Sequence, residues 1–206
     1  MDETYPLTYS VDYPDRDLDR LTTFFRIFTV IPIAIVLATV NHYVFSGWED
    51  SASTYAGAGG ILFLGPLLMI LFRQKYPRWW FDWNRELLRF ALRVHTYGVL
   101  MSDTYPSTDE EQWVRLEIEY PDVEADLSRG MPLVKWFLAI PHYIVLFFLY
   151  IAAFVCVVIA WFAILFTGRY PRSLFDFVLG VQRWTLRVAA YAFLLVTDRY
   201  PPFSLE

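Results

Sequence analysis

Two stretches of the chain carry the same charged residues at the same spacing. In each stretch an aspartate is followed by arginines seven and eleven positions later; the six residues are Asp82, Arg89, Arg93, Asp176, Arg183 and Arg187. On an α-helix both offsets fall within about 20° of the aspartate, so each set lies on one helix face. Guanidinium groups suit bidentate contact with phosphate oxygens. We therefore take these six residues as the candidate site for binding anionic lipid headgroups or an acidic partner.

A second interpretation of the same residues stays open. The two Asp-Arg-Arg sets can equally form the polar face of helices at a membrane interface, with arginine stems buried and each aspartate paired to a neighbour. The sequence contains no nucleophile elbow, no phosphate-binding glycine loop and no zinc-binding His-Glu-x-x-His motif. Of the three histidines, His42, His95 and His142, the first and the last would lie at opposite depths in the two parallel repeats, which argues against a shared haem or metal. We predict no catalytic residue, no cofactor and no metal site.

The composition is that of a membrane protein. Of the 206 residues 56% are hydrophobic and 19% aromatic, and the mean hydropathy is +0.35, whereas soluble domains are roughly 45–50% apolar. The apolar residues are grouped into long runs instead of alternating with charge. A net charge of −5 argues against binding nucleic acid. The single cysteine, Cys156, lies inside an apolar run and excludes a disulfide framework.

The chain is a duplication. Seven of its twelve prolines follow a tyrosine, and six of these Tyr-Pro pairs match between residues 1–110 and residues 111–206, which we take as the two repeats. Each repeat opens with an alternating segment, Thr8–Tyr13 or Val114–Tyr120, that predicts a short half-buried strand. We expect the two strands to pair with each other, and a disulfide between Ser10→Cys and Glu117→Cys tests this.

The apolar runs predict membrane-spanning helices. Phe24–Phe45 and Gly57–Phe72 form a hairpin in the first repeat, and basic residues flank both of its outer ends, which the positive-inside rule places in the cytoplasm. Residues 132–166 of the second repeat are almost wholly apolar. The duplication favours a second hairpin with a turn near Tyr150. The alternative is one tilted helix from about His142 to Phe166, with Ser173–Val196 crossing back.

The two Asp-Arg-Arg sets lie on residues 79–99 and 173–196. The pattern of these segments predicts amphipathic helices in the membrane interface. The alternative is that such a helix spans the membrane with its arginines turned inward. The predicted fold is an all-α integral membrane protein. It has duplicated helical hairpins (about four transmembrane helices), two interfacial amphipathic helices and two short cytoplasmic strands. We expect a multi-pass protein of the bacterial cytoplasmic membrane with both termini in the cytoplasm.

Two motif-bearing segments resemble a known family. The segments LVKWFLAIPHYIVLFFL and WFAILFTGRYPRSLFDFVLGVQRWTLRVAAYAFLLVTDRYPPFSLE are similar to the DUF4389 family of uncharacterised bacterial membrane proteins. The resemblance is close over Val114–Glu206 and weaker over the first repeat. It implies a bacterial membrane protein and brings no established activity or site residues.

The function predicted from these observations is non-enzymatic. We expect a membrane scaffold or accessory subunit whose partners are membrane lipids, anionic headgroups among them, or a larger membrane protein complex. Nucleic acid is not expected as a partner. A small oligomeric transporter or channel is the first alternative, because duplicated halves are common in transporters. A lipid-modifying enzyme that uses Asp82 or Asp176 ranks below it.

Overall fold

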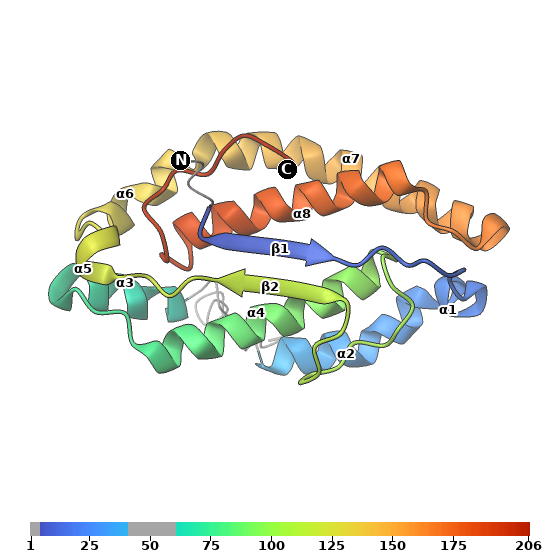
Figure 1. Ribbon diagram of the computed structural model, residues 1–206, viewed down its shortest axis with the longest axis horizontal. Coiled ribbons are helices and arrows are strands. Elements are labelled where there is room, and N and C mark those ends of the chain that lie inside the picture. The colour runs from blue at the N-terminus through green and yellow to red at the C-terminus, as the bar shows by residue number, and fades with distance from the viewer. Residues whose placement is uncertain (1–4, 41–60) are drawn as a thin grey trace, which may run out of the picture.

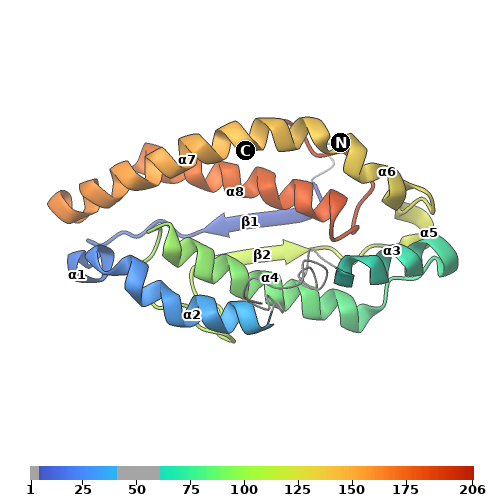
Figure 2. The same ribbon diagram turned by 180° about the vertical axis from the view of Figure 1, so that it is seen from behind.

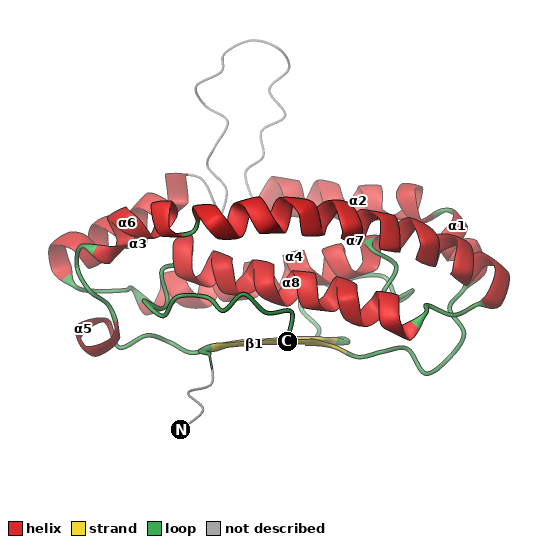
Figure 3. Ribbon diagram, turned by 90° about the horizontal axis from the view of Figure 1, so that it is seen from above, coloured by secondary structure: helices red, strands yellow, loops and turns green. Residues whose placement is uncertain are grey.

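The computed structural model describes residues 5–40 and 61–206 and arranges them in three layers (Figures 1 and 3). The elements, in chain order, are β1 (Leu7–Val11), α1 (Arg20–Phe24), α2 (Arg26–Val40), α3 (Ile61–Arg73), α4 (Arg78–Gly98), β2 (Val114–Ile118), α5 (Val123–Asp126), α6 (Met131–Leu138), α7 (Ile140–Thr167) and α8 (Arg172–Ala192). The sheet forms one layer and α4 and α8 form the middle one. The outer layer holds two rows of helices, α1–α2–α3 and α6–α7 (Figures 2 and 3).

The two strands pair with each other, as predicted. β1 and β2 are antiparallel, with Tyr9 opposite Leu116 at the centre of the ladder. Tyr9 and Leu116 each lie four residues before a Tyr-Pro pair, so they hold equivalent positions in the two repeats. The register is therefore symmetric about an axis that passes through this central pair. Alternation places one side of each strand against the helices and leaves the other side to solvent.

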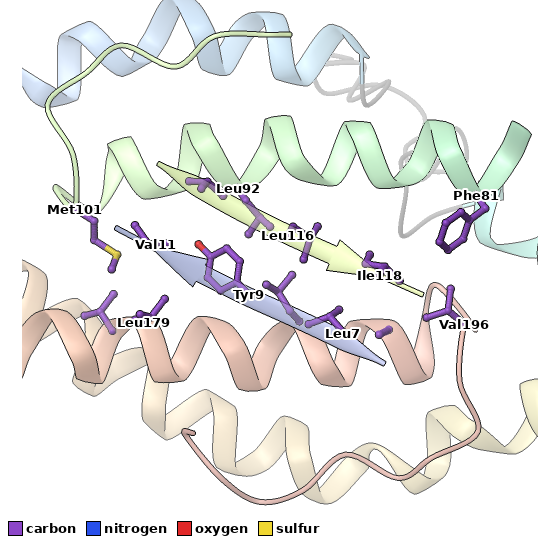
Figure 4. Packing of buried hydrophobic residues seen from close by; sticks show 14 of the residues in the cluster. Leu7, Tyr9, Val11, Phe81, Leu92, Met101, Leu116, Ile118, Leu179 and Val196 are labelled. Carbon is purple, nitrogen blue, oxygen red and sulfur yellow. The ribbon is translucent and has the colours of Figure 1, made fainter. Parts of the chain in front are cut away.

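Each strand packs on the helix that belongs to the other repeat. β1 contacts α8 and β2 contacts α4, so the two repeats exchange strands across the symmetry axis. The main hydrophobic core lies between the sheet and these two helices. Figure 4 shows this core, with Leu7, Tyr9 and Leu116 on the strands, Leu92 on α4 and Leu179 on α8.

The middle helices begin in the same way because their sequences repeat. Pro77 and Pro171 are the N-cap residues of α4 and α8, where the fixed φ of proline and its missing N–H cost nothing. One side of α8 packs on the sheet and another on α7, so most of its side chains are buried. The prediction that these helices lie by themselves in a membrane interface is therefore wrong. They are the amphipathic centre of a layered fold.

The predicted hairpin over residues 132–166 is also wrong. α7 runs without interruption over 28 residues, Ile140–Thr167, after a short α6. No glycine, proline, asparagine or aspartate occurs between Tyr143 and Phe166, so nothing there competes with the helical hydrogen bonds, and Gly168 with φ 78° ends the helix. The alternative of one helix from about His142 to Phe166 is the one observed.

The first repeat does not form the predicted transmembrane hairpin either. α2 and α3 lie end to end in one row and together match α6–α7 in the other row (Figure 2). The ends of the two predicted spans that face each other, including His42, fall outside the described residues. Among the described residues α7 alone is long and apolar enough to cross a membrane. The prediction of about four transmembrane helices, and with it the multi-pass topology, is not supported.

The tyrosines of the Tyr-Pro pairs connect the two repeats. The hydroxyl of Tyr13 donates to the carbonyl oxygen of Tyr170 at 2.6 Å, and that of Tyr120 donates to the carbonyl oxygen of Tyr76. These are equivalent residues, so one hydrogen bond occurs twice. The ring of Tyr13 also meets Phe175 edge-on at 5.0 Å, as Tyr120 meets Phe81 at 5.2 Å. Each pair ties the end of a strand to the start of the other repeat's helix.

The register leads to a cross-linking prediction. Thr8 lies opposite Glu117, whereas Ser10 lies opposite Arg115, so the Ser10–Glu117 pair that the sequence suggested is offset by two residues. In a Cys156→Ser background we expect Thr8→Cys with Glu117→Cys to form an intramolecular disulfide, because opposed Cβ atoms are about 4.5–5.5 Å apart. Ser10→Cys with Glu117→Cys is the matched control and should oxidise far more slowly. Gel mobility with and without reductant measures both; equal rates would contradict this register.

Candidate functional site

The four arginines of the candidate site lie on α4 and α8 and donate to main-chain carbonyls. Arg183 Nε is 2.9 Å from the carbonyl oxygen of Tyr9, and Arg89 Nε and Nη2 are 3.1 and 2.9 Å from that of Leu116. Tyr9 and Leu116 are the central pair of the sheet. Each arginine therefore holds the strand contributed by the other repeat.

The second arginine of each set binds the segment that follows its own helix. Arg93 donates to the carbonyl oxygens of Ser107 and Thr108 at 2.9 and 3.0 Å. Arg187 donates to those of Ser204, at 3.0 Å, and Glu206. Both arginines are buried, and burial lowers the pKa of each guanidinium.

The two aspartates form ion pairs within their own helices. Asp82 lies 3.4 Å from Arg85 and 3.9 Å from Arg78, and Asp176 lies 3.4 Å from Arg172. These carboxylates are partly exposed and take no part in the arginine–carbonyl contacts described above. The structure therefore brings the arginines of each set together with the backbone and leaves the aspartates at the surface. Binding of lipid or an acidic partner by these six residues stays a prediction.

A second pair of cations is buried where the outer helices meet the middle layer. Lys135 Nζ donates to the carbonyl oxygen of Thr197 at 2.7 Å and pairs with Asp198 at 2.7 Å. Burial lowers the pKa of Lys135, and Asp198 opposes that shift. Arg26, its counterpart in the first repeat, donates to the carbonyl oxygen of Ser102 at 2.9 Å. Both are interior groups that fasten α2 and α6 to the chain after each middle helix.

The outward side of α1, α2, α3, α6 and α7, which we call the outer face, is apolar. Most of the large hydrophobic side chains that solvent reaches lie on these five helices; the most exposed include Phe72, Phe137, Phe154 and Phe166, each at least 70% exposed. Monomeric soluble proteins rarely expose continuous apolar patches of more than a few hundred Å². An apolar environment or an apolar partner is therefore needed to cover the outer face.

The charges on these helices have one sign. The five helices contain no aspartate or glutamate, and their four basic residues are Arg20, Arg26, Arg73 and Lys135. Arg20 and Arg73 are exposed at the ends of the first row. The carboxylates Asp12, Glu117 and Glu119 are instead exposed on the strands or next to them, on the opposite side of the molecule. The fold thus separates an apolar, basic-edged face from an acidic one.

The residues that the structure describes contain no cluster of side chains arranged as a metal site. No group of three or more His, Cys, Asp or Glu side chains there could hold a metal ion. His142 is fully buried; its Nδ1 accepts a hydrogen bond from Trp184 Nε1 at 3.0 Å, and its ring stacks on Phe203. This is a packing role at the start of α7.

Comparison with known proteins agrees with the family resemblance. Residues 131–204 match the family described as Domain of unknown function (DUF4389). The match spans α6, α7, α8 and the chain that follows α8, which includes Lys135, Arg183, Arg187 and Asp198. No curated protein and no solved structure matches the chain.

The arginine–carbonyl contacts lead to a stability prediction. We expect Arg183→Ala and Arg89→Ala each to lower the free energy of unfolding by about 1–3 kcal/mol, because a part-buried strand carbonyl loses its charged donor. Arg115→Ala removes only an exposed ion pair with Asp12 and should change it by about 0.5 kcal/mol or less. Chemical unfolding in mild detergent measures all three. If Arg183→Ala left the stability unchanged but abolished lipid binding, the arginines would be a ligand site and not a structural one.

Proposed function

We propose that this protein is a non-enzymatic membrane scaffold that lies on one leaflet of a bilayer with its outer face in the hydrocarbon region. The observation that carries the proposal is the outer face itself, with its two rows of apolar helices in one layer. Transfer of one exposed Leu, Ile or Phe side chain from water into an apolar phase is favourable by about 1.5–3 kcal/mol. A few of the exposed side chains are enough for stable binding.

The direction of α7 supports an orientation in the membrane plane. α7 packs along α8, and both run beside the strands (Figures 1 and 2). An upright α7 would carry α8 and the sheet into the bilayer, together with the exposed Arg115 and Glu117. Each such charge costs about 2.5–3.5 kcal/mol near the bilayer centre. Parallel to the surface, α7 stays in the apolar phase while the sheet stays in water.

The charge distribution favours the cytoplasmic leaflet of a bacterial membrane. The exposed basic residues Arg20 and Arg73 lie at the ends of the outer helices, where they would meet anionic headgroups at the level of the membrane surface. The acidic strand edge would face the cytoplasm and remain open to soluble or membrane-bound partners. This arrangement fits an accessory subunit better than a channel, since a protein that lies on one leaflet offers no path across it.

The proposal predicts the depth of three positions on α7. Ile140, Ile151 and Phe162 are spaced by eleven residues, so they lie on nearly the same helix face, and each is about half exposed. We expect spin labels on Ile140→Cys, Ile151→Cys and Phe162→Cys, each in a Cys156→Ser background, to report the same shallow depth in vesicles. A spanning helix would instead place the middle label deepest and the outer two near the headgroups.

Matched charge variants complete this test. Phe154→Glu introduces a carboxylate into the outer face, and Thr8→Glu introduces one on the exposed side of the sheet. We expect Phe154→Glu to reduce vesicle co-flotation at least about tenfold, consistent with the cost of a buried charge, and Thr8→Glu to have little effect. If instead the labels were shielded from lipid in a stable dimer, the outer face would be a protein interface and the proposal would fail.

A further inference from the structure

The two ends of the sheet are equivalent in sequence but differ in structure. At one end the segments Tyr13–Asp17 (YPDRD) and Arg169–Arg172 (RYPR) meet. At the other end the equivalent segments are Tyr120–Glu124 (YPDVE) and Lys75–Arg78 (KYPR). By position Glu124 corresponds to Asp17 and Lys75 to Arg169. Each end therefore provides one acid and one base at matching places.

An ion pair closes the first end. Arg169 Nε lies 2.9 Å from Asp17 Oδ1, and the N–H of Leu18 donates to the carbonyl oxygen of Gly168 at 2.7 Å. A Cβ atom at Gly168 would lie 3.3 Å from the Asp17 side chain. The two segments are therefore in direct contact, and the acid and base of this end are paired with each other.

The other end is open. Lys75 and Glu124 line a cleft of about 780 Å³, and within the described part of the chain no ion pair joins them. Met69 of α3 and the rings of Trp79 and Tyr120 also line it, and Asp122 adds a second carboxylate. The equivalent acid and base are thus not paired at this end, and aromatic side chains line the same cleft.

We propose that this cleft binds the headgroup of a zwitterionic phospholipid. A molecule that takes the place of the missing ion pair needs a negative group for Lys75 and a positive group for Glu124. A phosphate with an ammonium a few atoms away has that arrangement: Lys75 binds the phosphate, and the ammonium lies against Glu124, Asp122 and the face of Trp79. The two carboxylates disfavour a purely anionic headgroup, and the lysine disfavours a free cation.

The position of the cleft gives the source of the ligand. It opens beside the end of α3, where the exposed Leu68 and Phe72 belong to the outer face. A lipid whose headgroup enters the cleft can keep its acyl chains in the hydrocarbon region beside those side chains. Trp79, 68% exposed, then lies at headgroup level, where tryptophan is enriched. The inference rests on the proposed membrane orientation and adds selectivity for one headgroup class.

The test uses a soluble headgroup, so that it does not depend on membrane binding. We expect glycerophosphoethanolamine to bind the full chain in detergent, measured by calorimetry, and glycerophosphoglycerol to bind at least about tenfold more weakly. Lys75→Ala and Glu124→Gln should each weaken glycerophosphoethanolamine binding about tenfold, because each removes one charged contact. Arg169→Ala removes the same charge at the equivalent, closed end and should leave binding unchanged.

The outcomes separate this inference from the proposed function. Vesicle co-flotation that persists while glycerophosphoethanolamine fails to bind, or binds equally to all variants, would overturn the headgroup site and leave the membrane scaffold standing. Loss of co-flotation with intact, Lys75- and Glu124-dependent binding would do the reverse, since the cleft would then serve a soluble phosphoammonium compound. Equal weakening by Arg169→Ala would show that the effect of Lys75→Ala is not specific to the cleft and would also overturn the site. Thermal unfolding of each variant confirms that it is folded.

Discussion

The contact between an arginine side chain and a strand carbonyl, made once in each repeat, is the constraint on which this structure depends. A two-stranded sheet is marginally stable by itself in water. Here Arg89 holds the centre of β2 and Arg183 the centre of β1, and each arginine comes from the repeat that did not supply the strand. The same contact therefore fixes the sheet onto the middle helices and joins the two repeats.

The layer order follows from that contact. α4 and α8 pack on the strands through buried apolar side chains as well as through the arginines, and their other sides pack against α2 and α7. Those outer helices then cover the middle layer with one side and expose the other. Lys135 and Arg26 complete the arrangement from within, each bonded to a carbonyl in the chain after a middle helix. This one packing arrangement leaves an apolar face exposed on one side of the molecule and the acidic sheet exposed on the other.

The residue pattern predicted only part of the candidate site. Helical spacing correctly placed the arginines of each set on one face, yet it could not show what that face contacts. The contacting carbonyls belong to residues as far as 174 positions away in sequence, and a backbone carbonyl has no sequence signal. The cleft of Lys75 and Glu124 was missed for a related reason. The signal was the substitution pattern between the repeats, but whether an equivalent acid and base meet depends on the tertiary structure, which pairs one set and leaves the other unpaired.

By itself the sequence determined the duplication, the alternation of both strands and the amphipathic character of the helices that carry the arginines, because all three depend on local periodicity. It also contained the reason for the continuous α7, the lack of any turn-forming residue between Tyr143 and Phe166. The tertiary structure decided which strand joins which helix. Two similar repeats offer the same local patterns for pairing within a repeat or across repeats, so only long-range packing selects the exchange. It decided, too, that α7 lies parallel to the sheet. Length and hydropathy describe a helix without reference to its neighbours, and here contacts along α8 set its direction.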